Sequence, residues 1–340
     1  MGFDVVDSAP VSVIVPAYNA EGTVEACLEA LVGQVVDRGL EIILVDDGST
    51  DGTARMAEAF GRGVKVVRQA HGGAAAARNR GLEEASGEII LFTDADCEPL
   101  ADWAAVMIEG IEAGADGVKG TYRTKQRNLV ARWVQAEYES KYRRMEGLEE
   151  IDFIDTYSAG YTREALEAVG GFDTGVVMVE DQELSFRLAE KGYKLRFVPE
   201  GVVYHRHVST VRDYVRRKFR IGYWKVLVMA RYPARIVNDS HTPQNVKVQM
   251  VLLGLLIGTI PAGLISGVAR KSAIGWAGAL VATTLPVAVQ TARTDWKVGL
   301  LAPAMSILRA GGLTAGTVMG LLRFGPSLVV RAFSTITGGR

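Results

Sequence analysis

Short apolar runs alternate with longer helical patterns through the first third of the chain. The apolar runs predict strands at residues 11–15, 41–45, 64–67 and 88–92, with helical stretches near 22–34, 51–60 and 74–85. Strands separated by helices indicate parallel βαβ units with right-handed crossovers. Because the strands are continuous apolar runs, we expect helices to cover both faces of the sheet.

The pattern becomes mixed between residues 100 and 207. It predicts helices near 101–112, 128–144, 163–169 and 181–191, and strands near 117–122, 194–198 and 202–206. We therefore predict one α/β catalytic domain at residues 10–207.

A basic, aromatic stretch follows this domain. Between residues 211 and 235, eight lysines and arginines are interleaved with tyrosine, phenylalanine and tryptophan. This composition suits an interfacial helix beside an anionic leaflet, although an ordinary solvated basic helix has a similar pattern. We interpret residues 208–245 as a basic amphipathic juxtamembrane region.

Three apolar segments come next. Residues 248–269 and 273–292 are each long enough to cross a bilayer, which takes roughly 20 apolar residues. The third segment, 298–322, is interrupted by Arg309 and rich in glycine, so it fits a crossing, an interfacial helix or a re-entrant pair. The alternative for all three is a buried helical hairpin in a soluble protein. We expect two to three transmembrane helices within residues 246–325 and a tail at 326–340.

The charge pattern sets an orientation and excludes one class of partner. The preceding basic stretch, with no apparent signal peptide at the N-terminus, predicts a multi-pass plasma-membrane protein whose catalytic domain is on the cytoplasmic face. The formal net charge of −1 gives no reason to expect nucleic acid as a partner. The two cysteines, Cys27 and Cys97, are expected to be free thiols.

Carboxylates follow three of the predicted strands. The strand ends carry residues 16–19, 46–51 and 93–96, and ligands of an open parallel sheet bind beyond such ends. Asp94 and Asp96 are spaced so that both can face one Mg²⁺ or Mn²⁺ ion, whose charge would neutralise a leaving diphosphate. A lone D-x-D pattern is also common at helix caps and turns, and Asp51 fits a cap better than a ligand.

Three further segments carry candidate chemistry. Residues 71–80 are glycine-rich and open a helix, so their amides and Arg78 suit an anion, although tight helix–sheet packing fits equally well. Glu180 and Asp181 fit either a charged helix start or a general base. His205 and His207 lack a third ligand nearby for a zinc site, and His207 is better suited to contact phosphates.

Six motifs in order give the chain a resemblance to glycosyltransferase family 2, the inverting enzymes with the GT-A fold. The resemblance covers roughly residues 10–225. The motifs are Val13-Ile-Val-Pro-Ala-Tyr-Asn19, Ile43-Leu-Val-Asp-Asp-Gly-Ser-Thr-Asp51, Ala77-Arg-Asn-Arg-Gly81, Gly87-Glu-Ile-Ile-Leu-Phe-Thr-Asp-Ala-Asp96, Gly170-Gly-Phe-Asp173 and Glu180-Asp181. The implied fold is a Rossmann-like mixed sheet that binds a nucleoside-diphosphate sugar, followed here by C-terminal transmembrane helices.

The resemblance also implies residue roles. Asp181 would be the catalytic base of a single in-line displacement, with Glu180 supporting it, and Asp96 and Asp94 would hold Mg²⁺ or Mn²⁺. The donor would be bound by Pro16, Tyr18, Asn19, Asp47, Arg78 and Asp94. We expect hexosyl transfer to a lipid-linked or other saccharide acceptor at the membrane. The acceptor or its phosphate would contact His207, Arg220 and Trp224.

One departure from the family bears on the product. Processive polysaccharide synthases carry Gln-x-x-Arg-Trp before their membrane helices, and residues 216–224 lack that spacing. We therefore expect transfer of one or a few sugars, as in lipid-linked glycan, cell-wall or exopolysaccharide assembly. The alternatives are a processive synthase and, from another class, a non-catalytic sugar-nucleotide-binding membrane protein.

Overall fold

The computed structural model of the chain describes residues 10–236 and 242–337. The chain forms two compact units. The α/β unit comprises residues up to Lys125 together with Tyr142–Arg206, and the helical unit comprises Gln126–Lys141 and the chain from His207 onward. Residues 237–241 of the predicted juxtamembrane region and 338–340 of the predicted tail lie outside the described residues.

The α/β unit is built on an eight-stranded mixed sheet in the order β3-β2-β1-β4-β7-β6-β8-β5. Its strands are β1 (Val11–Ala17), β2 (Leu40–Asp46), β3 (Val64–Arg68), β4 (Ile89–Phe92), β5 (Cys97–Pro99), β6 (Gly117–Arg123), β7 (Ala159–Thr162) and β8 (Leu195–His205). The first four strands run parallel to one another, as βαβ units require. β7 runs antiparallel to both β4 and β6, which makes the sheet mixed.

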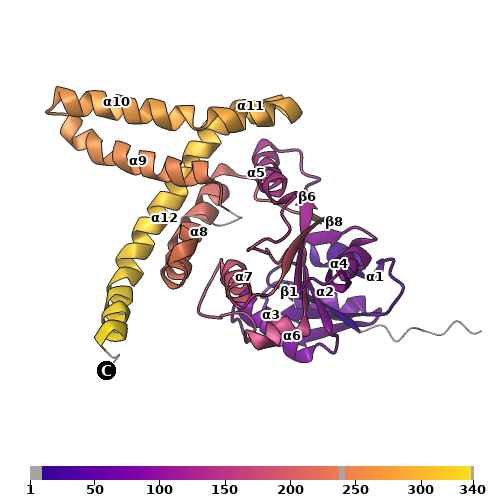
Figure 1. Cartoon of the computed structure of the whole chain (residues 1–340). Coiled ribbons are helices and arrows are strands. Elements are labelled where there is room, and N and C mark those ends of the chain that lie inside the picture. The colour runs from indigo at the N-terminus through magenta and orange to yellow at the C-terminus, as the bar shows by residue number, and fades with distance from the viewer. Residues whose placement is uncertain (1–9, 237–241, 338–340) are drawn as a thin grey trace, which may run out of the picture. The chain divides into compact units, whose positions relative to one another are not determined.

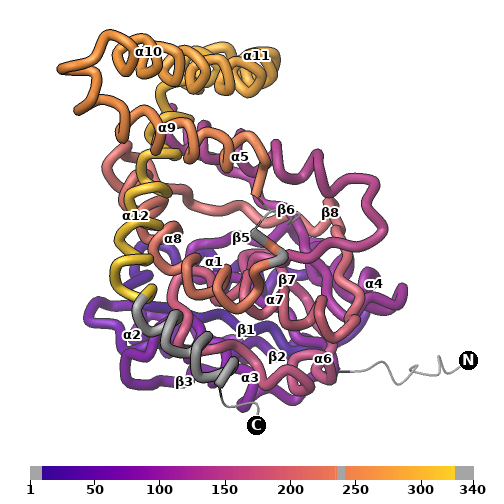
Figure 2. The backbone as a smooth tube through the Cα atoms, turned by 60° about the vertical axis from the view of Figure 1, so that its left-hand side comes forward, coloured from indigo at the N-terminus to yellow at the C-terminus, as the bar shows by residue number. Residues whose placement is uncertain are grey.

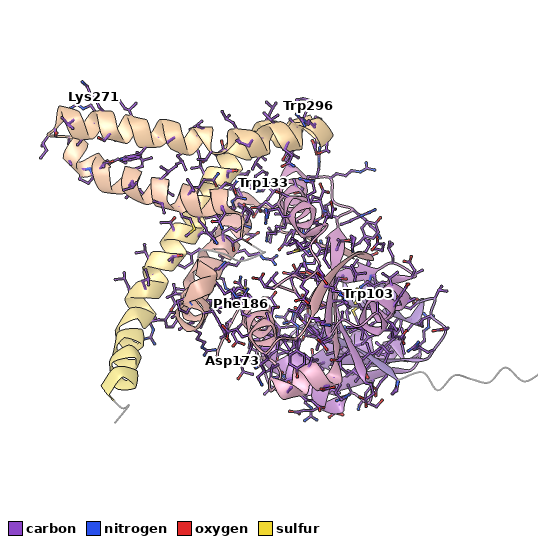
Figure 3. The ribbon with its side chains drawn as sticks, viewed as in Figure 1. Trp103, Trp133, Asp173, Phe186, Lys271 and Trp296 are labelled. Carbon is purple, nitrogen blue, oxygen red and sulfur yellow. The ribbon has the colours of Figure 1, made fainter. Side chains whose placement is uncertain are left out.

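Helices cover both faces of this sheet (Figure 1). They are α1 (Val24–Val32), α2 (Thr53–Phe60), α3 (Ala74–Glu84), α4 (Trp103–Glu112), α6 (Arg163–Ala168) and α7 (Glu180–Glu190). Ile14 and Phe92 belong to one core cluster with residues of α3, α6 and α7. Trp103 of α4 is fully buried in the interior of the α/β unit, where its indole N–H donates to Ser158 Oγ over 2.8 Å (Figure 3).

The sequence pattern predicts most of this architecture, with three differences. The strands expected at 194–198 and 202–206 are one long strand, β8. Strands β5 and β7 are not predicted, because both are short and neither has a continuous apolar run like that of β4. Both strands lie in the β7-β6-β8-β5 half of the sheet. The predicted α/β class and mixed sheet are confirmed, whereas the order of the strands was not predicted.

The helical unit contains α8 (Val211–Arg231), the 3₁₀ helix η1 (Pro233–Ile236), α9 (Gln244–Gly263), α10 (Gly267–Ala282), α11 (Leu285–Thr294) and α12 (Trp296–Thr337). The helix α5 (Leu129–Met145) contributes its residues up to Lys141 to this unit. Trp133 of α5 is buried among these helices and donates to Tyr214 Oη over 2.9 Å (Figure 3).

Glycines allow α12 to pack closely on α8, and Figure 2 shows the two helices side by side. Gly312, Gly316 and Gly320 recur every four residues along one face of α12. A Cβ atom at Gly316 would overlap the backbone of Phe219, and one at Gly320 would lie 2.5 Å from Tyr223 O. The glycines that weakened the third apolar segment as a predicted span therefore have a packing role.

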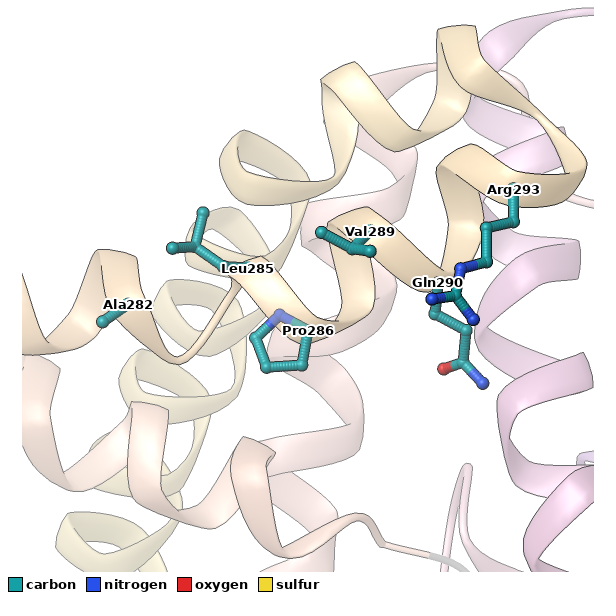
Figure 4. A pocket seen from close by; sticks show the side chains of 6 residues that line it. All are labelled: Ala282, Leu285, Pro286, Val289, Gln290 and Arg293. Carbon is teal, nitrogen blue, oxygen red and sulfur yellow. The ribbon is translucent and has the colours of Figure 1, made fainter.

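Within the described residues, three candidate membrane-spanning helices lie at the C-terminal end: Gln244–Gly263, Gly267–Thr294 and Trp296–Gly325. The helix α9 ends at Gly263, earlier than the apolar segment predicted at 248–269, because the chain turns at residues 264–266. An open pocket of about 590 Å³ lies on the second span (Figure 4). It is lined by Ala282, Leu285, Pro286, Val289, Gln290 and Arg293, so none of the predicted site residues contributes to it.

Candidate active site

Three strands bring the predicted site residues to one edge of the sheet. Ala17 of β1 pairs with Asp46 of β2, and Ile14 pairs with Phe92 of β4, so the segments that follow these strands emerge side by side. The first two segments are hydrogen-bonded together, since Asn19 N donates to Ser49 Oγ over 2.9 Å. The predicted convergence of strand ends is present in the structure.

Asp47 is buried and holds the glycine-rich segment before α3. Its Oδ1 accepts hydrogen bonds from Gln69 Nε2 (2.6 Å) and Gly72 N (2.8 Å). Its Oδ2 accepts from Gly73 N (2.8 Å) and lies 2.9 Å from His71 Nδ1. The anion facing these backbone amides is therefore Asp47 itself, and both of its oxygens are fully engaged.

An aromatic pair connects this segment with the end of β1. The Tyr18 ring stacks on the His71 ring with centroids 4.2 Å apart, and 47% of Tyr18 is exposed. Pro16, two residues earlier, lies half-buried in β1. An exposed stacked pair beside a polar strand end is a surface on which a planar base can stack.

Arg78 connects two of the predicted carboxylates. It lies in α3 with only 3% of its surface exposed. Nη2 donates to Asp94 Oδ1 over 2.9 Å, and Nη1 donates to Glu180 Oε1 over 2.8 Å. Burial raises the pKa of Asp94 to about 6, although the charge of Arg78 opposes the shift. Arg78 thus fixes the end of β4 against the start of α7.

Asp181 differs from its neighbour Glu180. It is half-buried, and its Oδ1 accepts from Gln182 N over 2.7 Å. Burial, together with the negative charges of Glu180 and Asp155, raises the pKa of Asp181 to about 8. A carboxyl with so high a pKa is a stronger base than an ordinary aspartate and is suited to accept a proton near neutral pH.

The next residue of α3 holds the loop that precedes α7. Asn79 Nδ2 donates to Phe172 O and its Oδ1 accepts from Phe172 N, both over 2.8 Å. Gly170 and Gly171 supply positive φ angles of 76° and 68°, which let the backbone approach Asn79. Arg78 and Asn79 therefore organise two parts of the site from adjacent positions.

Asp96 faces a different partner from Asp94. Its Oδ2 lies 3.5 Å from His205 Nε2, and 41% of its side chain is exposed. His205 lies opposite Cys97 in the β5–β8 pair, and donor atoms of Asp96, Cys97 and His205 lie within 4.8 Å of one another. The exposed carboxylate of Asp96 is a ligand that Mn²⁺ or Mg²⁺ accepts, and the imidazole of His205 suits a transition-metal ion such as Mn²⁺ better than Mg²⁺, whereas a buried thiol suits softer metals. These residues fit a divalent cation held through Asp96 and His205.

The predicted acceptor residues all lie in the helical unit. His207 is buried, with Nε2 3.0 Å from Gln135 Oε1 and its ring stacked on Tyr138. Arg220 is exposed on α8, and the Trp224 ring packs against Phe324 with centroids 5.7 Å apart. The three side chains thus have separate surroundings.

Sequence reasoning missed Asn79 and gave His205 no metal role. Asn79 lies within a quoted motif, and its adjacency to Arg78 was the available signal. The relation between His205 and Asp96 depends on β5, which is too short to be recognised from the sequence. Both cysteines are free and buried, and the free thiols are confirmed.

Comparisons with known proteins show the family to which the chain belongs. The family model described as Glycosyl transferase family 2 matches residues 12–170, and that of Glycosyl transferase family group 2 matches residues 114–306, more than half of the chain. Glycosyltransferase AglE of Haloferax volcanii is 27% identical over 224 residues, which cover 64% of this chain and 73% of the relative. The pre-mycofactocin glycosyltransferase of Mycobacterium tuberculosis is 28% identical over 66% of this chain, which spans 48% of that protein.

A solved structure shares the fold over nearly the whole chain. It is the mannosyltransferase PcManGT from Pyrobaculum calidifontis in complex with GDP-Man and Mn²⁺. Its TM-score is 0.60 at 21% identity, and the match covers 94% of this chain and 90% of the other. The fold, the family matches and the residues at the sheet edge lead to one conclusion: the chain is a glycosyltransferase that belongs to family 2.

Proposed function

We propose that this glycosyltransferase is metal-dependent and inverting, and that it moves a sugar from a nucleoside-diphosphate sugar to a membrane-associated, polyprenyl-linked glycan. The observation that carries the proposal is that two adjacent carboxylates have different surroundings. Glu180 is paired with the buried Arg78, whereas Asp181 has a pKa raised to about 8. A buried carboxyl whose pKa is raised toward neutrality is typical of an acid–base site.

Asp181 acts as the general base in this scheme. It takes the proton from an acceptor hydroxyl while the hydroxyl oxygen forms a bond to the anomeric carbon. The bond between that carbon and the leaving diphosphate breaks, and its electron pair stays on the diphosphate. One displacement inverts the configuration, so an α-linked donor gives a β-linked product. Arg78 and Asn79 keep the base helix α7 and the preceding loop in position.

Asp96 and His205 are proposed to hold the divalent cation. When bound, Mn²⁺ or Mg²⁺ supplies positive charge that stabilises the leaving diphosphate. Asp96 is the better placed of the two D-x-D aspartates, because Asp94 is engaged by Arg78. In this arrangement Asp94 faces the ribose and diphosphate of the donor. Tyr18, Asn19 and Pro16 contact the nucleobase of the donor.

Two observations guide the choice of donor nucleotides to test. The structure of PcManGT contains GDP-Man and Mn²⁺, so GDP-Man in the presence of Mn²⁺ is the first donor to test. The ring pair of Tyr18 and His71 offers stacking that any base can use.

The acceptor assignment is supported by the C-terminal part of the chain. Three candidate membrane spans follow α8, a helix with seven lysines and arginines. A basic helix beside membrane helices favours the cytoplasmic leaflet and an anionic lipid-linked substrate. The exposed Arg220 and the aromatic Trp224 on α8, together with His207, remain our candidates for acceptor contacts.

The test is a donor screen with the purified full-length chain in detergent. GDP-, UDP- and dTDP-sugars are offered with Mn²⁺ and a polyprenyl-diphosphate-linked sugar, and both nucleotide release and product anomeric configuration are measured. We expect release with one donor class and a β-linked product from an α-linked donor. A retained α-configuration would contradict the single displacement, and long products would favour the processive alternative.

A further inference from the structure

A buried ionic cluster lies in the helical unit, separate from the proposed catalytic residues. Glu137 of α5 accepts from Arg309 Nη1 of α12 over 2.9 Å, and its other oxygen lies 3.1 Å from Lys218 Nζ of α8. Gln249 of α9 accepts from Arg309 Nη2 over 3.0 Å. Four helices therefore meet at one polar cluster, in which Glu137 is 8% exposed and Arg309 is 6% exposed.

Among the residues that the structure describes, the charges of this cluster do not cancel. Two cations, Lys218 and Arg309, face one carboxylate, and Glu137 stays ionised because the adjacent cations lower its pKa to about 2. Among the described residues that act on the cluster, Lys141 and Arg217 are also cations. A buried excess of positive charge is unfavourable unless an anion compensates it.

Donor groups in the cluster also lack acceptors among the described residues. Arg309 Nε is buried without a hydrogen-bond partner, and so is the Ser306 hydroxyl three residues earlier on α12. Burial lowers the pKa of Lys218, which Glu137 offsets only in part, so a further anion beside Lys218 would stabilise its charged form. The side chain of Lys218 is 16% exposed, so a ligand can reach the cluster from the surface through this residue.

We propose that Lys218 and Arg309 bind the phosphate group of an anionic isoprenoid lipid, and that this group completes the charge of the cluster. A phosphate suits the site because several oxygens accept from lysine and arginine at once. We assign the phosphate to a lipid because Gln249 and Arg309 lie in candidate membrane spans. This inference rests on the proposed function, in which a sugar hydroxyl reacts and the lipid phosphate needs a site of its own.

The chain offers variants that separate binding from folding. Lys218→Met removes one cation and leaves Glu137 and Arg309 as a neutral pair, so the apo protein should stay as stable as the wild type. Arg309→Met leaves Glu137 and Lys218 in the same way. Arg216→Met is the matched control, since it removes a cation from the exposed side of the same helix.

The test measures binding of farnesyl diphosphate to the full-length chain in phosphatidylcholine nanodiscs. EDTA is present so that no metal bridges the lipid diphosphate to the proposed donor site. We expect Lys218→Met and Arg309→Met to weaken binding at least tenfold, and Arg216→Met to bind like the wild type. Farnesol, which lacks the diphosphate, should not bind at this site. Wild-type affinity in Lys218→Met, or equally tight binding of inorganic diphosphate, would overturn the proposal.

Transfer assays separate this inference from the proposed function. If the wild type transfers sugar to a polyprenyl-diphosphate acceptor and Lys218→Met has the same acceptor KM, the phosphate site is wrong and the proposed function stands. If the wild type shows no transfer to that acceptor but binds farnesyl diphosphate through Lys218, the acceptor assignment fails and the phosphate site stands.

Discussion

Arg78 Nη1 donates a hydrogen bond to Glu180 Oε1 over 2.8 Å, joining two residues that are 102 positions apart in the chain. The same guanidinium also holds Asp94 at the end of β4. One buried cation therefore connects the strand end assigned to the donor with the helix assigned to the base. Without it, two carboxylates would face each other with no compensating charge.

Arg78→Met should destabilise the protein and abolish transfer. Removing one partner of a buried ion pair costs about 3–5 kcal/mol, because a buried charge is left uncompensated. Thermal unfolding of the detergent-solubilised chain measures the loss. Arg80→Met is the control on the same helix, where Arg80 pairs with Glu84 at the surface and such pairs contribute about 0–1 kcal/mol. Equal stability of the two variants would show that the bridge is weak.

The pH dependence of transfer should reflect Asp181. Because the base accepts a proton only when ionised, kcat/KM should rise with pH and level off above the Asp181 pKa of about 8. Asp181→Asn should lower kcat by about 10²–10⁴-fold, the range of general acid–base catalysis. Glu190→Gln, at the exposed end of α7, should keep wild-type activity. A rate in Asp181→Asn equal to that of the wild type would remove this residue from the mechanism.

The raised pKa of Asp181 also predicts that the stability of the folded protein depends on pH. The pKa of Asp181 is higher in the folded state than the ordinary value of 3.8. The folded state therefore binds the proton more tightly, so this contribution is complete in acid and is lost as pH rises toward about 8. Asp181→Asn cannot ionise, so its Tm relative to the wild type should increase between pH 5 and pH 9. A constant difference across that range would contradict the raised pKa.

The sequence predicted the scaffold of the site better than its pairings. Continuous apolar runs marked the first four strands, and the polar residues after Ala17, Asp46 and Phe92 lie at one edge because parallel strands share a direction. What the pattern could not provide was the identity of the partners. Asp94 and Asp96 are two residues apart, yet one is bound by Arg78 and the other lies beside His205.

For the candidate membrane spans, too, the sequence indicated the elements but not their side-chain partners. Length and hydropathy were enough to locate three candidate spans, but Arg309 looked like an interruption of the third. Its partner Glu137 lies 172 residues earlier in a helix that sequence reading assigned to the catalytic domain. Long-range pairing of this kind leaves no local periodicity, so it could not be read from the sequence.

Metal binding should depend on Asp96 and His205 together. Even partners that only support a ligand typically contribute about 10–100-fold to metal affinity, so Asp96→Ala and His205→Ala should each weaken Mn²⁺-dependent donor binding at least about tenfold. Calorimetric titration of GDP- or UDP-sugar with Mn²⁺ measures this. His207→Gln is the comparison, because His207 lies with Gln135 in the helical unit. Unchanged affinity in His205→Ala would remove it as a ligand.

Asp47→Asn should weaken the binding of all donor nucleotides to a similar extent. The amides of Gly72 and Gly73 donate to different oxygens of Asp47, so an asparagine amide would direct a donor group at one of the two, and the segment before α3 would lose part of its anchor. A residue that organises the loop affects every base, whereas a residue that reads the base changes their ranking. Dissociation constants for GDP, UDP and dTDP distinguish the two, and a changed ranking would assign base recognition to Asp47.

Gly316→Ala should separate α8 from α12 and destabilise the helical unit. The new methyl group would overlap the Phe219 carbonyl, and relieving overpacking of this kind costs about 1–3 kcal/mol. Gly278→Ala on α10 provides the control, since its Cβ atom would meet no described atom within 4 Å. Thermal unfolding in detergent should show a lower Tm only for Gly316→Ala. Because Lys218 and Arg309 lie on the two helices, loss of their close packing should also weaken farnesyl diphosphate binding. If Gly316→Ala kept both stability and binding, the glycine face of α12 would not be the contact that brings these cations together.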